Sequence, residues 1–166
     1  MAAEPIKLTV LKALTAHLEG IVGPEWGDYD LRGAVYRGRM RFGDDEPTTF
    51  LSIVEAPRPD SGREAGENRA TRSYEWPLLL QGWTADDVKN PTDPVYYLLD
   101  QVERRLNMII EVKSHSGSPA HPSVYMLGGL ITNLSFGPGV CRQPTDGVSS
   151  KAFLYIPLRV GLATIG

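Results

Sequence analysis

Residues Tyr74–Trp83 read Tyr-Glu-Trp-Pro-Leu-Leu-Leu-Gln-Gly-Trp, and this run of aromatic and aliphatic residues decides the fold. Its length and the glycine near its end are typical of a well-buried β-strand. Because proline has no backbone N–H to donate, Pro77 indicates that the strand lies at a sheet edge or carries a bulge at that point. The pattern predicts one strand, and the rest of the chain must supply the other strands of its sheet.

A polar connector, Thr84–Thr92, follows this strand, and a helix of about 18–20 residues is predicted beyond it. Asp93 can accept hydrogen bonds from the first free amides, and Pro94 suits the first helical position. Lys113 closes the helix, so positive charge gathers at its C-terminal end. The apolar residues recur at helical spacing: Val95, Leu98, Leu99, Val102, Leu106 and Ile109. We therefore expect this face of the helix to lie on the sheet.

The other elements follow from the same periodicities. A helix is predicted over Pro5–Ile21, and strands are predicted over Ala34–Phe42, Thr48–Glu55, Val124–Phe136 and Ser150–Ala163, with loops over Gly23–Leu31, Ser114–Ser123 and Gly137–Ser149. The first two of these strands should form a hairpin. Gly128 and Gly129 predict a bulge, bend or split, and Pro157 predicts an edge or bulge. The order predicts an α+β fold: a mixed, largely antiparallel sheet packed against two main helices, with long polar loops, as one domain over residues 1–166.

Residues 56–73 differ from their surroundings, because they contain no aromatic residue and no aliphatic residue larger than alanine. Such a segment cannot bury enough apolar area to offset the entropy lost on ordering. We expect a mobile loop here. Structureless loops of this length are often functional, and contact with a neighbouring subunit is one such function.

Composition excludes several classes of protein. The chain has 166 residues, of which 42% are hydrophobic and 22% charged, and this composition suits one globular domain. Its net charge of −3 argues against nucleic acid as its main ligand, because nucleic acid binds to positively charged surfaces. The single cysteine, Cys141, excludes an internal disulfide and favours a reducing compartment. No signal peptide is visible at the N-terminus, and no apolar run is long enough to span a bilayer.

No motif for catalysis, for a cofactor or for a metal is present. Asp86, Asp87 and Asp93 could bind a divalent ion, but a helix-capping turn is favoured because their spacing matches no calcium loop. His115 and His121 lack a third ligand within their loop. The sequence places no catalytic or metal-ligating partner near Cys141 or His17. We therefore favour an incidental thiol for Cys141 and a satisfied histidine for His17. We expect no enzyme activity, although a site assembled in space leaves no linear motif.

Three arginines alternate along one predicted strand: Arg37, Arg39 and Arg41. They could form an anion-facing strand that grips a phosphate group. A solvated face, or one paired with the acids at Asp44 and Asp45, is favoured because the whole chain is negative.

The order of these elements resembles that of tailed-phage tail terminator (tail completion) proteins and related minor tail proteins. The resemblance lies in the N-terminal helix, the arginine-bearing strand pair and the polar loop, and above all in Glu75 to Leu106. There an apolar strand ending Gln81-Gly82-Trp83 leads through an acid-rich turn to Asp93-Pro94-Val95-Tyr96-Tyr97-Leu98-Leu99.

The resemblance implies a subunit that closes into a homohexameric ring in the virion, at the head-proximal end of the tail. Such a ring caps the tail tube protein, stops its polymerisation and meets the head connector and neck proteins, with DNA only passing through its lumen. It is made in the cytoplasm of the bacterial host, has no membrane partner, and brings no catalytic residues or cofactors. Opposite charges could meet across the ring interface or in its lumen. The candidate residues for these contacts are Arg58, Arg63, Arg69, Arg72, Asp86 and Asp87.

Other functions stay open on the sequence alone. Within the same structural class, a head–tail neck or head-completion protein fits the layout as well. A small anion-binding module would use the arginine strand. A small hydrolase using Cys141 or an Asp/His pair comes last, because no nucleophile and base are placed together.

Overall fold

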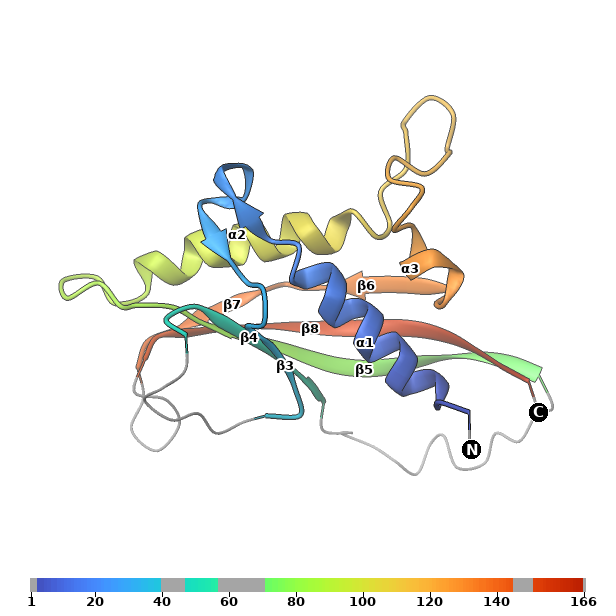
Figure 1. Ribbon diagram of the computed structural model, residues 1–166, viewed down its shortest axis with the longest axis horizontal. Coiled ribbons are helices and arrows are strands. Elements are labelled where there is room, and N and C mark those ends of the chain that lie inside the picture. Colours follow the sequence, from blue (N-terminus) through green and yellow to red (C-terminus); the bar gives the residue numbers. More distant parts are fainter. Residues whose placement is uncertain (1–2, 40–46, 57–70, 145–150, 166) are drawn as a thin grey trace.

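A six-stranded sheet forms one layer of the molecule, and the helices α1 (Ile6–Leu18) and α2 (Asp93–Asn107) cover one of its faces (Figure 1). The computed structural model describes residues 3–39, 47–56, 71–144 and 151–165. The strands across the sheet are β3 (Val35–Arg37), β4 (Phe50–Glu55), β5 (Thr71–Trp83), β8 (Phe153–Ile165) and β6 (Asn133–Phe136), with β7 (Val140–Arg142) also paired to β8. All pairings except β3–β4 are antiparallel. The predicted α+β fold is confirmed.

Two smaller units complete the chain. The strands β1 (Val22–Gly23) and β2 (Tyr29–Asp30) pair around a short 3₁₀ turn, Pro24–Trp26, where only a loop was predicted. A single turn, α3 (Met126–Gly129), precedes β6.

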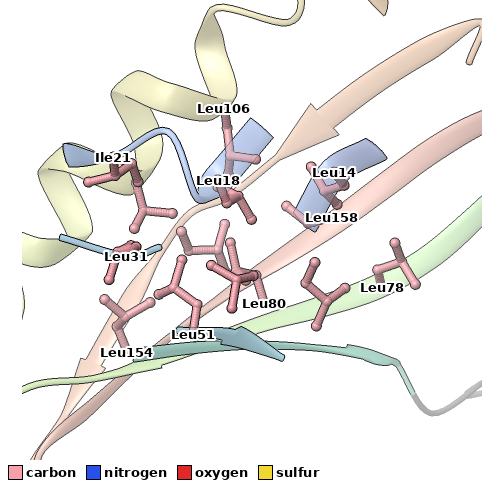
Figure 2. Close-up of a cluster of buried hydrophobic side chains, with 14 of the residues drawn as sticks. Leu14, Leu18, Ile21, Leu31, Leu51, Leu78, Leu80, Leu106, Leu154 and Leu158 are labelled. Atoms are coloured by element: carbon pink, nitrogen blue, oxygen red, sulfur yellow. The ribbon is translucent and has the colours of Figure 1, made fainter. Parts of the chain in front are cut away.

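The core lies between the sheet and the two helices. Alternation along β5 and β8 sends one set of side chains to the helices, and the register aligns them, with Leu78 opposite Leu158 and Leu80 opposite Ile156. Figure 2 shows Leu14 and Leu18 of α1 and Leu106 of α2 in the same cluster as Leu51, Leu80 and Leu154 of the sheet. The predicted apolar face is confirmed, because its five residues within α2 are buried, and so is Ile109 just beyond the end of the helix.

Both strand prolines lie where a neighbouring strand is interrupted. Ala56 N–H donates to the Pro77 carbonyl at 3.2 Å, just past the end of β4. Gly137 N–H donates to the Pro157 carbonyl at 3.0 Å, between β6 and β7. In an antiparallel ladder the N–H and C=O of one residue point to the same neighbour, so each missing N–H faces a break in pairing. β5 and β8 are central strands overall, but the prolines sit at local edges, as their chemistry requires.

The predicted hairpin of the first two strands is wrong, because β3 and β4 run parallel, with Val35 opposite Leu51. Twelve residues, 38–49, separate the two strands, which is about the length that a return crossover needs. β3 is also shorter than predicted. It ends at Arg37 because Gly38 takes a left-handed conformation with φ 70°, and residues 40–42 lie outside the described residues.

Several boundaries also differ from the prediction. α2 has 15 residues and ends at Asn107 rather than near Lys113, and the chain continues from there in hydrogen-bonded turns. Thr92, not Asp93, is the N-cap residue, and no side chain makes a capping hydrogen bond. Asp93 is the first helical residue, and Pro94 lies in the first turn, where its missing N–H is no loss.

The predicted strand Val124–Phe136 and the two long loops also need correction. The strand is realised only over β6, since α3 occupies its first part. The loop Gly137–Ser149 contains β7. Of the predicted mobile loop, residues 57–70 lie outside the described residues, and Thr71–Ser73 belong to β5.

Candidate interaction surfaces

The N-terminal end of α2 presents large apolar side chains to solvent. Burial of Val95, Leu98 and Leu99 against the sheet turns the intervening Tyr96 and Tyr97 outward, because helical residues three and four apart share a face. The two tyrosines are 57% and 71% exposed, and Val88, in the connector before the helix, is fully exposed. Exposed apolar side chains that cluster in this way are typical of binding surfaces.

The same stretch of chain carries four exposed carboxylates. Asp86 accepts a hydrogen bond from Ala152 N–H at 2.7 Å, and Asp87 accepts one from Asn90 N–H at 2.8 Å, so both acids also fix the connector. We define the acidic tyrosine surface as Asp86, Asp87, Val88, Asp93, Tyr96, Tyr97 and Asp100, all exposed. None of its four carboxylates forms an ion pair with another described residue. The predicted helix-capping role is therefore wrong, because no side chain caps α2. Asp87 instead accepts within its own turn, and Asp86 ties the connector to the residue before β8.

A second cluster locks α1 against α2. His17 Nε2–H donates to the Arg105 carbonyl at 2.7 Å, and Arg105 Nε–H donates to the His17 carbonyl at 2.7 Å. The other ring nitrogen, His17 Nδ1, is buried and has no hydrogen-bond partner among the described residues. The pKa of His17 is lowered to about 4, mainly by burial and in smaller part by the charge of Arg105, against the opposing effect of the hydrogen bond to the Arg105 carbonyl. His17 is thus a neutral core residue, and the predicted satisfaction of its ring holds for Nε2 but, among the described residues, not for Nδ1.

Trp26 ties the β1–β2 unit to the same helix. The guanidinium groups of Arg104 and Arg105 lie 4.7 and 5.3 Å from the centre of its ring, and Arg104 also donates to the Glu25 carbonyl at 3.3 Å. Guanidinium over an indole face is a favourable electrostatic contact. This cluster could not be predicted from the sequence, because Trp26 and Arg104 are far apart along the chain.

The arginine strand does not form one face in the described part of the chain. Arg37 Nη1–H donates to Thr15 Oγ1 of α1 at 3.1 Å, whereas the guanidinium of Arg39 lies 4.5 Å from the centre of the Tyr36 ring. The left-handed Gly38 between them breaks the alternation. Arg41 lies outside the described residues. The structure therefore separates Arg37 and Arg39 where the strand pattern placed them together.

The remaining predicted interface residues cannot be placed. Arg58, Arg63 and Arg69 lie outside the described residues, and so does the side chain of Arg72. Their meeting with Asp86 and Asp87 across a subunit interface stays a prediction.

Within the described ranges, no group of three His, Cys, Asp or Glu residues is placed to hold a metal ion. His121 instead pairs with Glu111 at 2.7 Å, an acid that precedes the predicted loop Ser114–Ser123. The same ranges contain no helix long and apolar enough to cross a membrane.

Cys141 should react slowly with alkylating reagents. Burial, with Glu103 nearby, raises the pKa of the thiol to about 11 from 9.0. At pH 7 the reactive thiolate is therefore about a hundredfold scarcer than in an ordinary thiol, and we expect iodoacetamide labelling of the native protein to be slower by about that factor. The same chain in guanidinium chloride is the control. Native labelling as fast as the control would instead support a nucleophilic thiol.

No protein-family model matches this chain, and no curated protein matches it. The function therefore has to be argued from the surfaces themselves.

Proposed function

We propose that this protein is a structural subunit of a phage tail. Copies of the chain close into a homo-oligomeric ring, six in number, that caps the tail tube, stops its polymerisation and joins it to the head connector. The ring is part of the virion and needs no cofactor.

The acidic tyrosine surface is the observation that carries this proposal. The residues behind the family resemblance, from the acid-rich turn through Tyr96 and Tyr97, divide into two sets. Val95, Leu98 and Leu99 serve the core, whereas the tyrosines and the aspartates are exposed and are not needed to bury the helix. A surface of this kind suits contact with another protein more than it suits chemistry on a small substrate.

The electrostatics of the described residues support the same choice. The largest downward pKa shifts fall on groups with structural explanations: burial between two helices lowers the pKa of His17, and the hydrogen-bonded Arg32 lowers the pKa of Asp30 to about 2. Neither group lies beside a nucleophile in hydrogen-bonding reach. An active site would instead bring perturbed groups together.

The mass of the purified protein in solution tests the proposal. Light scattering over a concentration series should give a discrete species near six times 18.2 kDa, and negative-stain electron micrographs of that species should show rings. Addition to tail tubes should cap their ends, which separates a terminator from a neck protein. A monomer at every concentration that also leaves the ends of added tail tubes uncapped would contradict the ring.

A further inference from the structure

The negative charge of this chain is concentrated in the stretch that contains the acidic tyrosine surface. Residues 84–103 contain five carboxylates against a single lysine, Lys89, giving a net charge of −4, whereas the whole chain carries −3. All other residues together therefore carry +1. Because the carboxylates of the surface have no ionic partner among the described residues, the surface favours a partner that supplies positive charge.

The segment that follows α2 has the opposite character. Residues 112–145 contain no aspartate and no glutamate. Close to the helix this segment carries Lys113 and His115, which are both exposed, and neither side chain pairs with another described residue. Ammonium and imidazole groups can donate hydrogen bonds to carboxylates. The segment therefore offers donors to an acidic surface without bringing a like charge with them.

Hydrogen bonds of its own hold the beginning of this segment as a short arm, which we define as residues 111–121. Ala120 N–H donates to the Glu111 carbonyl at 2.9 Å, and the Glu111 carboxylate pairs with His121 at 2.7 Å, so the base of the arm is closed. At the tip, Lys113 N–H donates to the Ser118 carbonyl at 2.8 Å. Figure 1 shows the arm projecting from the body of the molecule beyond α3. A partner that binds an arm already held in this way has less chain to order.

The helix α2 separates the arm from the acidic tyrosine surface. It has 15 residues, a length of about 22 Å, with the surface at its N-terminal end and the arm beyond its C-terminal end. Figure 1 shows the 84–92 connector and the arm toward opposite ends of the long axis. Two distinct surfaces on one rigid subunit are what a head-to-tail ring requires, because each copy must present both at once.

We infer that the arm of one copy docks against the acidic tyrosine surface of the next copy. The inference rests on the proposed ring and names the two surfaces that close it. Lys113 and His115 meet the carboxylates, which fixes the surfaces that pair. The exposed rings of Tyr96 and Tyr97 supply faces for the lysine and apolar area for Val112, which is 45% exposed on the arm.

Two charge-reversed variants test this docking. The first carries Lys113→Glu and His115→Glu on the arm, and the second carries Asp93→Lys and Asp100→Lys on the acidic tyrosine surface. Each variant alone should lose the wild-type mass in light scattering and leave tail tubes uncapped, because like charges would face each other at every junction. One chain that carries all four substitutions should regain both the mass and the capping, since opposite charges then meet again.

The controls keep the outcomes separate. Glu4→Lys with Glu75→Lys makes the same change in charge as the second variant, on exposed carboxylates outside both surfaces, and should behave as the wild type. Circular dichroism checks that each variant is folded. Folded two-substitution variants that keep the mass and the capping, or a folded four-substitution chain that does not regain them, would overturn the inference while leaving the ring intact. A wild-type monomer that also leaves tail tubes uncapped would overturn the proposed function, and the inference with it.

Discussion

Replacing Leu80 with alanine should lower the free energy of unfolding by about 3–4 kcal/mol. Leu80 is fully buried on the face of β5 that the helices cover, opposite Ile53 of β4 and Ile156 of β8 (Figure 2). Truncation removes buried apolar side-chain atoms and leaves a cavity that the flanking strands cannot close. Urea titration followed by circular dichroism measures the loss.

The adjacent residue supplies a matched control. Leu79 has the same side chain on the same strand, but it points to the sheet face opposite the helices and is only half-buried. Leu79→Ala should cost less than about 1 kcal/mol under the same conditions, because the side chain leaves fewer packed neighbours behind. Equal losses at the two positions would mean that the second face is packed as tightly as the first, against the layer arrangement described above.

Stability should fall as the pH is lowered from about 6.5 to about 4, and His17 should account for the fall. Its pKa is about 4 in the folded protein and 6.5 for the exposed side chain, so the unfolded chain binds more protons in this window. Protonation would place a charge on a buried nitrogen that has no acceptor, beside Arg105. The shift corresponds to about 3 kcal/mol, present in full above pH 6.5 and lost toward pH 4.

Denaturant titrations at several pH values between 4 and 7 measure this slope. His17→Gln removes the titrating group and retains a side-chain donor for the Arg105 carbonyl, so its stability should vary much less across the window. His115→Gln, which replaces an exposed histidine in the segment after α2, is the matched control. A wild-type slope that survives His17→Gln would assign the pH dependence to other groups. Asp30 is not one of them, because its lowered pKa, about 2, places its effect at lower pH.

The sequence predicts best what is decided locally. The apolar face of α2 follows from the helical spacing of five buried residues, and the long strands β5 and β8 follow from runs rich in aliphatic and aromatic residues. The segment before β6 could not be predicted this way, because Met126 and Leu127 take left-handed conformations that such residues rarely adopt. Met126 N–H donates to the Ile109 carbonyl, a contact to a distant part of the chain. The parallel pairing of β3 is likewise set by its neighbours.

The same division applies to the candidate surfaces. The acid-rich turn is visible in the sequence, and Tyr96 and Tyr97 could have been identified as aromatic residues that fall outside the apolar period of their helix. The contact between His17 and Arg105 joins residues 88 positions apart, and no local pattern reports it. Arg37 and Arg39 share a face in an ideal strand, and only the conformation of Gly38 separates them.

The position of β8 has a consequence for how the protein is made. This strand pairs with β5 along thirteen residues and also carries β6 and β7, yet it is encoded after all of them. During translation, β4, β5 and both helices leave the ribosome before the strand that joins the two halves of the sheet. The sheet can therefore be completed only once residues 153–165 have emerged, and such long-range pairing slows folding. An incomplete chain cannot form the finished subunit, so premature termination should yield no species able to join an assembly.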